Sequence, residues 1–424
     1  MSSRIVTVTA NPALDVSTTV ARIEPDEKLR GRGSRIDPGG GGVNVSRLVH
    51  RLGGATLAIV ALGGVEGDAY RRLLEEEGVP FAAVPIAEET RQNFAVHEEA
   101  TGRHFRFVLE GPVITAEEWA AILGAARRAL RPGDWLVSSG SMPPGAPEDA
   151  VAQLVRLAHE TGARAVVDSS GAALAAALEA SPELIKPSRR ELEELVGRPL
   201  PDDAAVQAAA AGLVAERGVG TVVVTLGADG AMLVSADGTV RLPAVDIVPV
   251  STVGAGDSFL AGLVLRLAQG RPLADALRTA LAAGAATAAG AGTRLASPEE
   301  VARLEAGRPR RAIDGSSRPR ESEGIRDAPG REVRDVMGID DIVEKAKDLA
   351  EGAAERIKDV AGDAKELAGD AVENVKELAG DAAENVKEFA DDAVDKAKDV
   401  LGVDEKPQGS SSPPASQTPP SGGA

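Results

Sequence analysis

The stretch STVGAGDSFLAGLVLRLAQG, residues 251–270, joins a glycine-rich turn to a run with helical apolar spacing. The first backbone N–H groups of a helix have no partner within the helix, and the positive end of the helix dipole lies beside them. We therefore expect an anion-binding turn at Gly254, Ala255 and Gly256. Asp257, at the mouth of that turn, could accept a hydroxyl proton while the amides stabilise a transferring group. The alternative is a simple Asp N-cap behind a tight turn.

On the amino-terminal side of this stretch, short β-branched runs alternate with Ala/Leu-rich segments of helical spacing. The predicted strands include RIVTVT (4–9), TLAIVAL (56–62), DWLVSSG (134–140), ARAVVDSS (163–170) and TVVVTLG (221–227), and the predicted helices include 69–78, 116–130 and 147–162. This alternation predicts one α/β domain over residues 1–306, with a mostly parallel sheet and helices on its faces. Residues 16–36 and 92–109 lack the helical period, and we interpret them as a small β-sheet that projects from the core as a lid.

A second glycine cluster, PGGGGVNV at residues 38–45, opens another predicted helix. Successive glycines permit close approach of the backbone to a ligand, and Asn44 is placed to direct its amide at that ligand. A flexible connector is the alternative. The first lid stretch contains the cations Lys28 and Arg30, and Arg91 directly precedes the second stretch. Together these three cations could hold a phosphate monoester. Taken singly, each cation could equally be a solvated surface side chain.

Composition excludes several classes of function. The 424 residues carry a formal net charge of −18, which repels nucleic acid backbones and anionic membranes, and aromatic residues make up only 2%. The chain has no cysteine, which fits a reducing cytosol, and no apolar run reaches the ~18 residues of a membrane span. The four histidines, at 50, 97, 104 and 159, have no zinc-ligand spacing. We expect a cytoplasmic protein that binds neither nucleic acid nor membrane.

The carboxyl-terminal part has a different composition. Residues 307–336 are rich in Arg, Gly, Ser and Pro and are predicted to be a flexible linker. Residues 337–405 contain an 11-residue repeat, seen in VENVKELAGDA (372–382) and AENVKEFADDA (383–393), which predicts acidic amphipathic helix. Residues 406–424 are Pro/Ser-rich and predicted to be disordered. The repeat segment resembles the short mycobacterial antitoxin-like helical proteins, and its partner is unknown.

The two glycine motifs, in this order, resemble the two signatures of the PfkB family of carbohydrate kinases. The resemblance extends from Ile5 to Leu304 and includes the strings ANPALD (10–15), DEKLRGRG (26–33), DPGGGGVNVSR (37–47), TRQNFAVHEEATGRHFRFVLEG (90–111), SSGSMPPG (138–145), VDSSGAAL (167–174) and GAGTRLAS (290–297). It implies a ribokinase-like three-layer sandwich with a small β-sheet lid. Gly41 stands where the 1-phosphofructokinase and tagatose-6-phosphate kinase branches usually have lysine, so the likeness favours the 6-phosphofructokinase branch of the minor bacterial type.

The resemblance also implies roles for individual residues. By this resemblance, Asp257 would be the general base, and Gly254, Ala255 and Gly256 would form the anion hole. The sugar phosphate would be bound by Asp15, Lys28, Arg30, Gly40, Gly41, Asn44, Arg91 and Ser141. ATP would be bound by Lys186, Ser188, Thr225, Leu226, Gly227 and Gly230. Glu191 would organise Mg²⁺ through water, and carbonyls of Ser251, Val253 and Gly292 would hold a monovalent cation such as K⁺.

One position departs from the family pattern. The NxxE motif reads Ser188-Arg189-Arg190-Glu191 here. A serine hydroxyl can still hydrogen-bond a metal-bound water, but with one donor fewer and a shorter reach, so we expect weaker handling of Mg²⁺ or ATP. An N-cap of a surface helix is the alternative interpretation of this site.

The predicted activity is ATP-dependent phosphorylation of D-fructose 6-phosphate at C1. The closest alternatives are phosphorylation of fructose 1-phosphate or tagatose 6-phosphate. An alternative of another class is a nucleotide-sensing module in which the helical tail is the working part, as a toxin partner or a stress protectant. We also expect a homodimer through the lid, because a projecting sheet has unpaired edges and an apolar face.

Overall fold

The computed structural model describes residues 3–290 and 292–307. The predicted repeat segment and Pro/Ser-rich tail lie outside these residues, as does the predicted linker beyond Gly307. None of the helices in residues 3–290 and 292–307 is long and apolar enough to cross a membrane.

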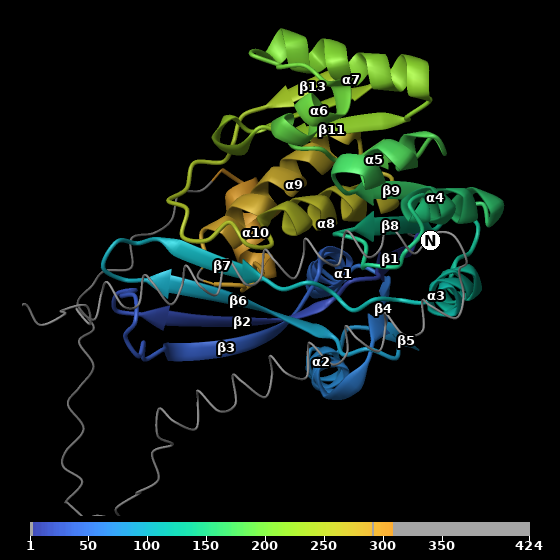
Figure 1. The fold of residues 1–424 in the computed structure, drawn as a ribbon. Helices are drawn as coiled ribbons and strands as arrows, with labels where there is room; N and C mark the ends of the chain where they lie inside the picture. The colour runs from blue at the N-terminus through green and yellow to red at the C-terminus, as the bar shows by residue number, and fades with distance from the viewer. Residues whose placement is uncertain (1–2, 291, 308–424) are drawn as a thin grey trace, which may run out of the picture. The chain divides into compact units, whose positions relative to one another are not determined.

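A nine-stranded sheet forms the centre of the described part (Figure 1), with strand order β13-β12-β11-β10-β9-β8-β1-β4-β5. Neighbouring strands from β11 to β5 all pair in parallel, whereas β12 pairs antiparallel with both β11 and β13. The mostly parallel sheet expected from the sequence is confirmed. Its strands are β1 (Ile5–Thr9), β4 (Thr56–Leu62), β5 (Phe81–Pro85), β8 (Trp135–Ser139), β9 (Arg164–Asp168), β10 (Leu184–Ile185), β11 (Thr221–Thr225), β12 (Ala231–Ser235) and β13 (Gly238–Leu242).

Helices cover both faces of this sheet. Successive side chains of a strand point to opposite faces, so one strand contributes to the apolar core on both sides of the sheet. Val222 and Val224 belong to the apolar cluster under α3 to α7, whereas Val223 between them belongs to the cluster under α1, α8, α9 and α10. The three layers are therefore helices, sheet and helices. The helices are α1 (Gly41–Arg51), α2 (Gly64–Glu76), α3 (Ala116–Ala129), α4 (Ala150–Glu160), α5 (Gly171–Leu178), α6 (Arg189–Val196), α7 (Asp203–Arg217), α8 (Ala255–Ala268), α9 (Leu273–Ala288) and α10 (Pro298–Glu305).

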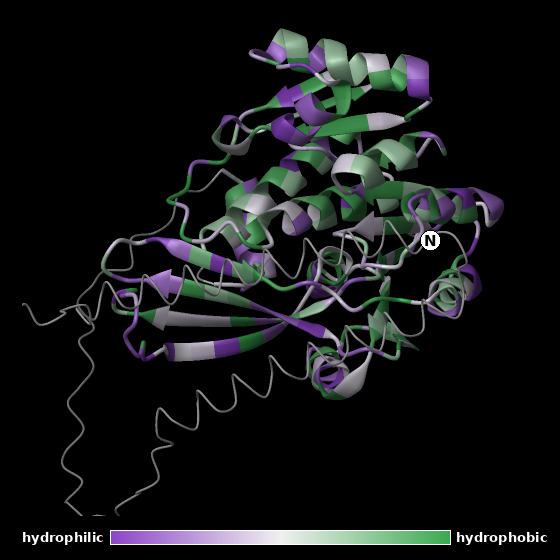
Figure 2. Cartoon of the chain, viewed as in Figure 1, coloured by the Kyte–Doolittle hydropathy of each residue, from purple (hydrophilic) through white to green (hydrophobic). Residues whose placement is uncertain are grey.

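A second, four-stranded sheet projects from one side of the core (Figure 1), with strand order β3-β2-β6-β7. Its strands are β2 (Ala13–Val20), β3 (Arg32–Gly39), β6 (Arg91–Glu98) and β7 (His104–Val108). They extend the predicted segments 16–36 and 92–109 at the ends that join the core. Figure 2 shows hydrophilic and hydrophobic stretches mixed along these strands, as expected for a sheet that is covered on one face only.

The register of the small sheet brings distant polar residues together. β2 pairs in parallel with β6, so Asp15 lies beside Asn93. β3 runs directly into Gly40 and α1, and α8 begins immediately after Gly254. The inner end of the small sheet, the start of α1 and the start of α8 therefore meet in one region.

Candidate active site

The first turn of α8 is a free helix N-terminus. Gly254 at the N-cap has φ 72°, a left-handed conformation that favours glycine. The amide of Ala255 donates to the carbonyl of Thr252 at 3.3 Å, but the amides of Gly256 and Asp257 have no acceptor among the residues that the structure describes. This turn has the geometry that the sequence predicts for an anion cradle.

The carboxylate of Asp257 lies in the first turn of α8 and is partly exposed. Asn44 Nδ2 donates to Asp257 Oδ2 at 2.9 Å, so the two predicted site residues, 213 positions apart, are in contact. Burial by the surrounding protein and the negative charge of Asp168 raise the pKa of Asp257 to about 6, against the opposing hydrogen bond from Asn44 and the charge of Lys186. A carboxylate whose pKa approaches neutrality is suited to accept and release a proton.

Lys186 brings a buried positive charge to the same turn. Its Nζ lies 2.9 Å from Asp168 Oδ1 and the residue is only 6% exposed. Burial opposes the ammonium form, but the carboxylate of Asp168 outweighs it and raises the pKa of Lys186. A methyl group placed on Gly256 would lie 3.9 Å from Lys186 Nζ, so this cation faces the open amides of α8.

Asp15 defines a second part of the site, at the inner end of the small sheet. Asn93 Nδ2 donates to Asp15 Oδ1 at 2.9 Å, and burial raises the pKa of Asp15. Asp15, Asn93 and Arg106 line a narrow cleft that also includes Val253 and Thr293. The small sheet and the loop before α8 thus form opposite walls of the cleft.

Arg91 and Ser141 lie near Asn11, in the turn that leads into β2. Arg91 Nη2 donates to the Asn11 carbonyl at 3.2 Å, and Nη1 donates to the Leu109 carbonyl at 2.8 Å. Ser141 Oγ accepts from Asn11 Nδ2 at 3.1 Å. The charges of Arg91 and Asp15 influence one another, so Arg91 lies close to the cleft.

Lys28 and Arg30 are not brought to this cleft by the single chain. Both are exposed on the connection between β2 and β3, and neither contacts another described side chain through a hydrogen bond or ion pair. Their predicted phosphate-binding role stays a prediction.

The second glycine cluster permits a close packing of backbones. Gly40 has φ 117°, and a side chain on Gly41 would overlap Ser139 Oγ and lie 2.9 Å from the amide nitrogen of Gly140. In this packing, a side chain at Gly40 would be strained and one at Gly41 would overlap its neighbours, so the flexible-connector alternative does not describe this turn.

The predicted nucleotide residues lie at the ends of β10 and β11. Thr225 pairs with Ser188 in an isolated bridge, and Leu226, Gly227 and Gly230 form the turn that follows β11. The amide of Leu226 donates to the carbonyl of Gly230 at 2.8 Å, which closes that turn.

Ser188 and Glu191 form a capping box at the start of α6. Ser188 Oγ accepts from the amide of Glu191 at 3.2 Å, and Glu191 Oε2 accepts from the amide of Ser188 at 2.7 Å. Ser188 is therefore the N-cap of α6, as the alternative interpretation predicted. The charge of Glu191 also acts on Lys186 and Asp168, so its carboxylate remains beside the site.

The residues predicted to hold a monovalent cation lie together. Ser251 Oγ donates to the Gly292 carbonyl at 2.7 Å, and the amide of Val253 donates to Ser251 Oγ at 3.3 Å. Within residues 3–290 and 292–307, no cluster of three or more His, Asp or Glu side chains could hold a metal ion.

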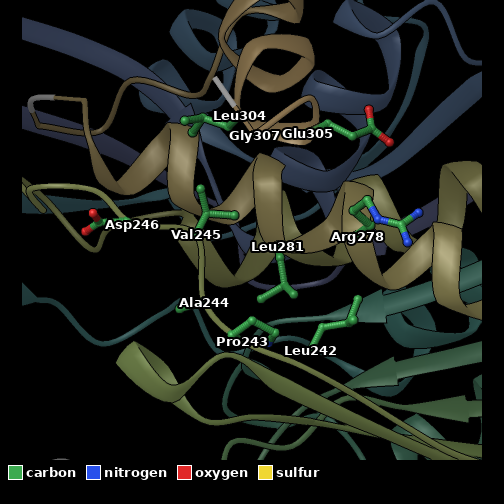
Figure 3. A pocket seen from close by; sticks show the side chains of 10 residues that line it. All are labelled: Leu242, Pro243, Ala244, Val245, Asp246, Arg278, Leu281, Leu304, Glu305 and Gly307. Carbon is green, nitrogen blue, oxygen red and sulfur yellow. The ribbon is translucent and has the colours of Figure 1, made fainter. Parts of the chain in front are cut away.

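A cavity of about 470 Å³ lies elsewhere, between the segment after β13, α9 and α10 (Figure 3). Leu242, Leu281 and Leu304 contribute to its mainly apolar wall, and none of the predicted site residues lines it. Arg278, at its edge, is paired with Asp275 at 2.7 Å.

Several residues of the site were not singled out by sequence reasoning. Asp168 and Ser139 are the last residues of two parallel strands. Ligands of α/β proteins bind at the carboxyl ends of such strands, so this position in the sequence could have indicated both residues. Asn93 and Arg106 lie on the small sheet, and only the strand register places them beside Asp15.

Comparison with known proteins agrees with this geometry. Residues 6–300 match the model of the pfkB family carbohydrate kinases. The ATP-dependent 6-phosphofructokinase isozyme 2 of Escherichia coli K12 is 40% identical over 306 residues, covering 72% of this chain and 98% of the relative. The enzyme of that name from Mycobacterium tuberculosis is 39% identical over 301 residues, covering 71% and 88%. A 1-phosphofructokinase from Xanthomonas campestris is 35% identical over 332 residues, covering 77% and 97%.

Solved structures of carbohydrate kinases also match this chain. The crystal structure of phosphofructokinase-2 from E. coli in complex with potassium matches with a TM-score of 0.69 and 39% identity, covering 72% of this chain and 99% of that chain. The tetrameric inhibited form of that enzyme gives 0.68 and 38%, with the same coverage. Ribokinase from Arabidopsis thaliana, with a TM-score of 0.57, 20% identity and coverage of 72% and 99%, shows the ribokinase-like fold alone. The chain belongs to the pfkB family of carbohydrate kinases.

Proposed function

We propose that this protein transfers the γ-phosphoryl group of ATP to the C1 hydroxyl of D-fructose 6-phosphate, giving fructose 1,6-bisphosphate. The observation that carries this proposal is the position of Asp257: its carboxylate accepts a hydrogen bond from Asn44, has a pKa raised to about 6 and belongs to the helix turn that has the open amides of α8. The relatives named 6-phosphofructokinase, which this chain matches over nearly their whole length, support the choice of substrate.

The chemistry follows from the charges around that turn. Asp257 takes the proton from the attacking hydroxyl, and the amides of Gly256 and Asp257 stabilise the oxygens of the transferring group. Lys186, held by Asp168, supplies a fixed positive charge next to those amides. The reaction then requires little movement of protein groups, because the donors already face the anion.

On the sugar side, Asp15 and Asn93 are placed to bind hydroxyl groups. They are in hydrogen-bond contact and line the cleft between the small sheet and Val253. Arg91 and Arg106 act electrostatically on Asp15 and are the cations near it that can balance a phosphate. The sugar would therefore lie between the small sheet and α8.

The residues present fit Mg²⁺ and K⁺. Mg²⁺ bound to a nucleotide keeps several of its waters, and the carboxylate of Glu191, whose charge acts on Lys186, would organise the ion through one of those waters. Bound there, Mg²⁺ would neutralise part of the charge of the nucleotide phosphates. The carbonyls around Ser251, Val253 and Gly292 are oxygen ligands of the kind that K⁺ prefers, and a related enzyme is described in complex with potassium.

We also infer a homodimer that forms through the small sheet. Ile36 of β3, Phe94 of β6 and Phe107 of β7 lie in one cross-strand row on the same face of this sheet, and they are 52%, 37% and 54% exposed. An apolar surface of this kind marks a contact between proteins, and a related enzyme is described as tetrameric. Light scattering of the purified chain tests this, and cell fractionation tests the predicted cytoplasmic location.

Phosphorylation of fructose 1-phosphate is the second candidate, because 1-phosphofructokinases also match this chain. The backbone around Gly41 argues against it. A side chain at this position would overlap Ser139 Oγ, so the lysine typical of that branch does not fit the turn as it stands. Tagatose 6-phosphate kinases share that lysine pattern, and the same argument applies to them.

The alternative of another class is a nucleotide-sensing module whose working part is the helical tail. The relatives consist almost entirely of the part that aligns with residues 6–300, which favours an enzyme with an accessory tail.

A substrate panel tests the proposed function. The full chain is incubated with ATP, Mg²⁺ and, in turn, fructose 6-phosphate, fructose 1-phosphate and tagatose 6-phosphate, and ADP formation is measured. The highest kcat/KM is expected with fructose 6-phosphate. A preference for fructose 1-phosphate would establish the second candidate, and ADP formation with none of the three would favour the sensing module.

A further inference from the structure

Arg47 is a buried charged residue of α1 whose role lies outside the chemistry described so far. It is 1% exposed, and each of its five N–H groups has an acceptor. Nε donates to Glu77 Oε2 at 3.0 Å, Nη1 donates to the Pro38 carbonyl at 2.9 Å and to Asn44 Oδ1 at 3.3 Å, and Nη2 donates to Asp37 Oδ1 at 3.3 Å and to Glu77 Oε1. One of these five bonds leads directly to the active site.

The carboxamide of Asn44 lies between Arg47 and Asp257. A guanidinium can only donate hydrogen bonds, so the atom of Asn44 that faces it must be oxygen. An ionised carboxylate can only accept, so the atom that faces Asp257 must be nitrogen. Both requirements are met by one orientation, in which Oδ1 faces Arg47 and Nδ2 lies 2.9 Å from Asp257 Oδ2.

We propose that Arg47 is a positioning residue for phosphoryl transfer: its guanidinium fixes the carboxamide of Asn44 so that the amide nitrogen, and not the oxygen, faces the general base Asp257. The inference deepens the proposed function and rests on it. Without the donor at Oδ1, the carboxamide can rotate by half a turn, and its oxygen would then face the carboxylate of Asp257.

The guanidinium is itself held from two sides. Asp37 of β3 accepts from Arg47 and from Thr293 Oγ1, the latter at 2.5 Å. Glu77 accepts from Arg47 and from Arg51 Nη2, the latter at 3.1 Å. Because Asp37 belongs to β3 and Glu77 ends α2, Arg47 is anchored to two elements other than its own helix and cannot follow Asn44 if the carboxamide moves.

Arg47→Lys is the informative substitution. Lysine keeps the positive charge that Asp37 and Glu77 require but has three N–H groups and no planar fork, so it cannot supply all five bonds. We expect kcat at pH 6.5 to fall about tenfold, because the carboxamide of Asn44 loses the donor that holds its orientation, while KM for ATP stays unchanged.

The pH profile gives a readout that loss of stability alone would not move. The groups that act on Asp257 are Asn44 from α1, Lys186 after β10, Asp168 at the end of β9 and Asp15 from β2. Of these, Arg47→Lys disturbs only Asn44, whose hydrogen bond favours the ionised carboxylate. The acid limb of kcat is therefore expected to move to higher pH.

The experiment is a double-mutant cycle on the full chain, made with the sugar phosphate that the wild type uses best. Arg47→Lys should lower kcat in the wild-type background and have no effect when Asn44 is already alanine. Arg51→Lys is the matched control, because Arg51 lies on the same helix and shares Glu77 but does not touch Asn44. Its kcat should equal that of the wild type. Independent, additive effects of Arg47→Lys and Asn44→Ala would overturn the proposal, as would equal effects of Arg47→Lys and Arg51→Lys.

A second measurement needs neither turnover nor a folded Arg47 variant. In the wild type labelled with ¹⁵N-asparagine, the Asn44 side-chain resonance, identified by its loss in Asn44→Ala, should shift as Asp257 titrates near pH 6. The shift should vanish in Asp257→Asn. A resonance that stays constant between pH 5 and 8 would refute the contact on which the proposal depends, whatever substrate the enzyme prefers.

Discussion

The pH dependence of kcat/KM tests the pKa of Asp257. The substitution Asp168→Asn distinguishes the titration of Asp257 from that of the substrate. Only the ionised carboxylate can accept a proton, so activity is present above the pKa and is lost as the pH falls through it. With a pKa of about 6, Asp257 is about 97% ionised at pH 7.5, about half ionised at pH 6 and about 9% ionised at pH 5. The expected fall between pH 7.5 and pH 5 is thus about tenfold.

The wild-type profile alone is ambiguous, because phosphate monoesters such as the sugar substrate also titrate near pH 6. Asp168→Asn resolves this. The charge of Asp168 raises the pKa of Asp257 and also engages Lys186, whose own charge lowers it. Removing the Asp168 charge removes one direct cause of the raised pKa of Asp257, so this pKa should fall, whereas the pKa of the substrate is unaffected.

The assay is a coupled measurement of ADP release at subsaturating sugar phosphate and saturating ATP, from pH 5 to 8, for the wild type and Asp168→Asn. The acid limb should lie at lower pH in the variant, even if its maximal rate is reduced. Superimposable acid limbs, or a wild-type rate that is flat down to pH 5, would refute the assignment of Asp257 as a base whose pKa Asp168 raises.

Three further predictions concern the phosphate sites and the extent of the enzyme. Gly256→Ala should raise the thermal stability slightly, by up to ~1 kcal/mol, because alanine is the better helix former, while a methyl 3.9 Å from Lys186 Nζ should lower kcat at least tenfold. Full activity with the added methyl would show that phosphate does not approach this turn. Arg91→Ala should raise KM for the sugar phosphate far more than KM for ATP, and equal rises would count against its phosphate role. A chain that ends after Gly307 should retain kcat within about twofold, and loss of activity in a folded truncation would tie the tail to catalysis.

The fold could be predicted because its signals are local. The β-branched runs such as TVVVTLG and the helical spacing of residues 116–130 correspond to β11 and α3, as their composition indicates. The small sheet was located by the lack of helical period, but its strands begin and end closer to the core than predicted. Residues 13–15 and 37–39 pair with each other across β2 and β3, and this pairing is not visible in either segment alone.

The site was predictable only where a motif marks it. Gly254, Asp257 and Asn44 belong to glycine-rich motifs that open helices, and the structure brings Asn44 and Asp257 into contact. Arg47 and Asp168 carry no such mark, because an arginine within a helix and an aspartate after a strand are common in any sequence. Their importance comes from burial and from partners far away in the chain, which only the tertiary structure reveals.

The most direct measurement of the central claim compares Asp257→Asn with the wild type, using fructose 6-phosphate, ATP and Mg²⁺ at pH 7.5. Asparagine keeps the size of the side chain but cannot take up a proton, so kcat should fall by at least about 10², while the dissociation constant of fructose 6-phosphate, measured by calorimetry, should change little. A folded Asp257→Asn protein that keeps a kcat within about threefold of the wild type would contradict the claim that this carboxylate is the base.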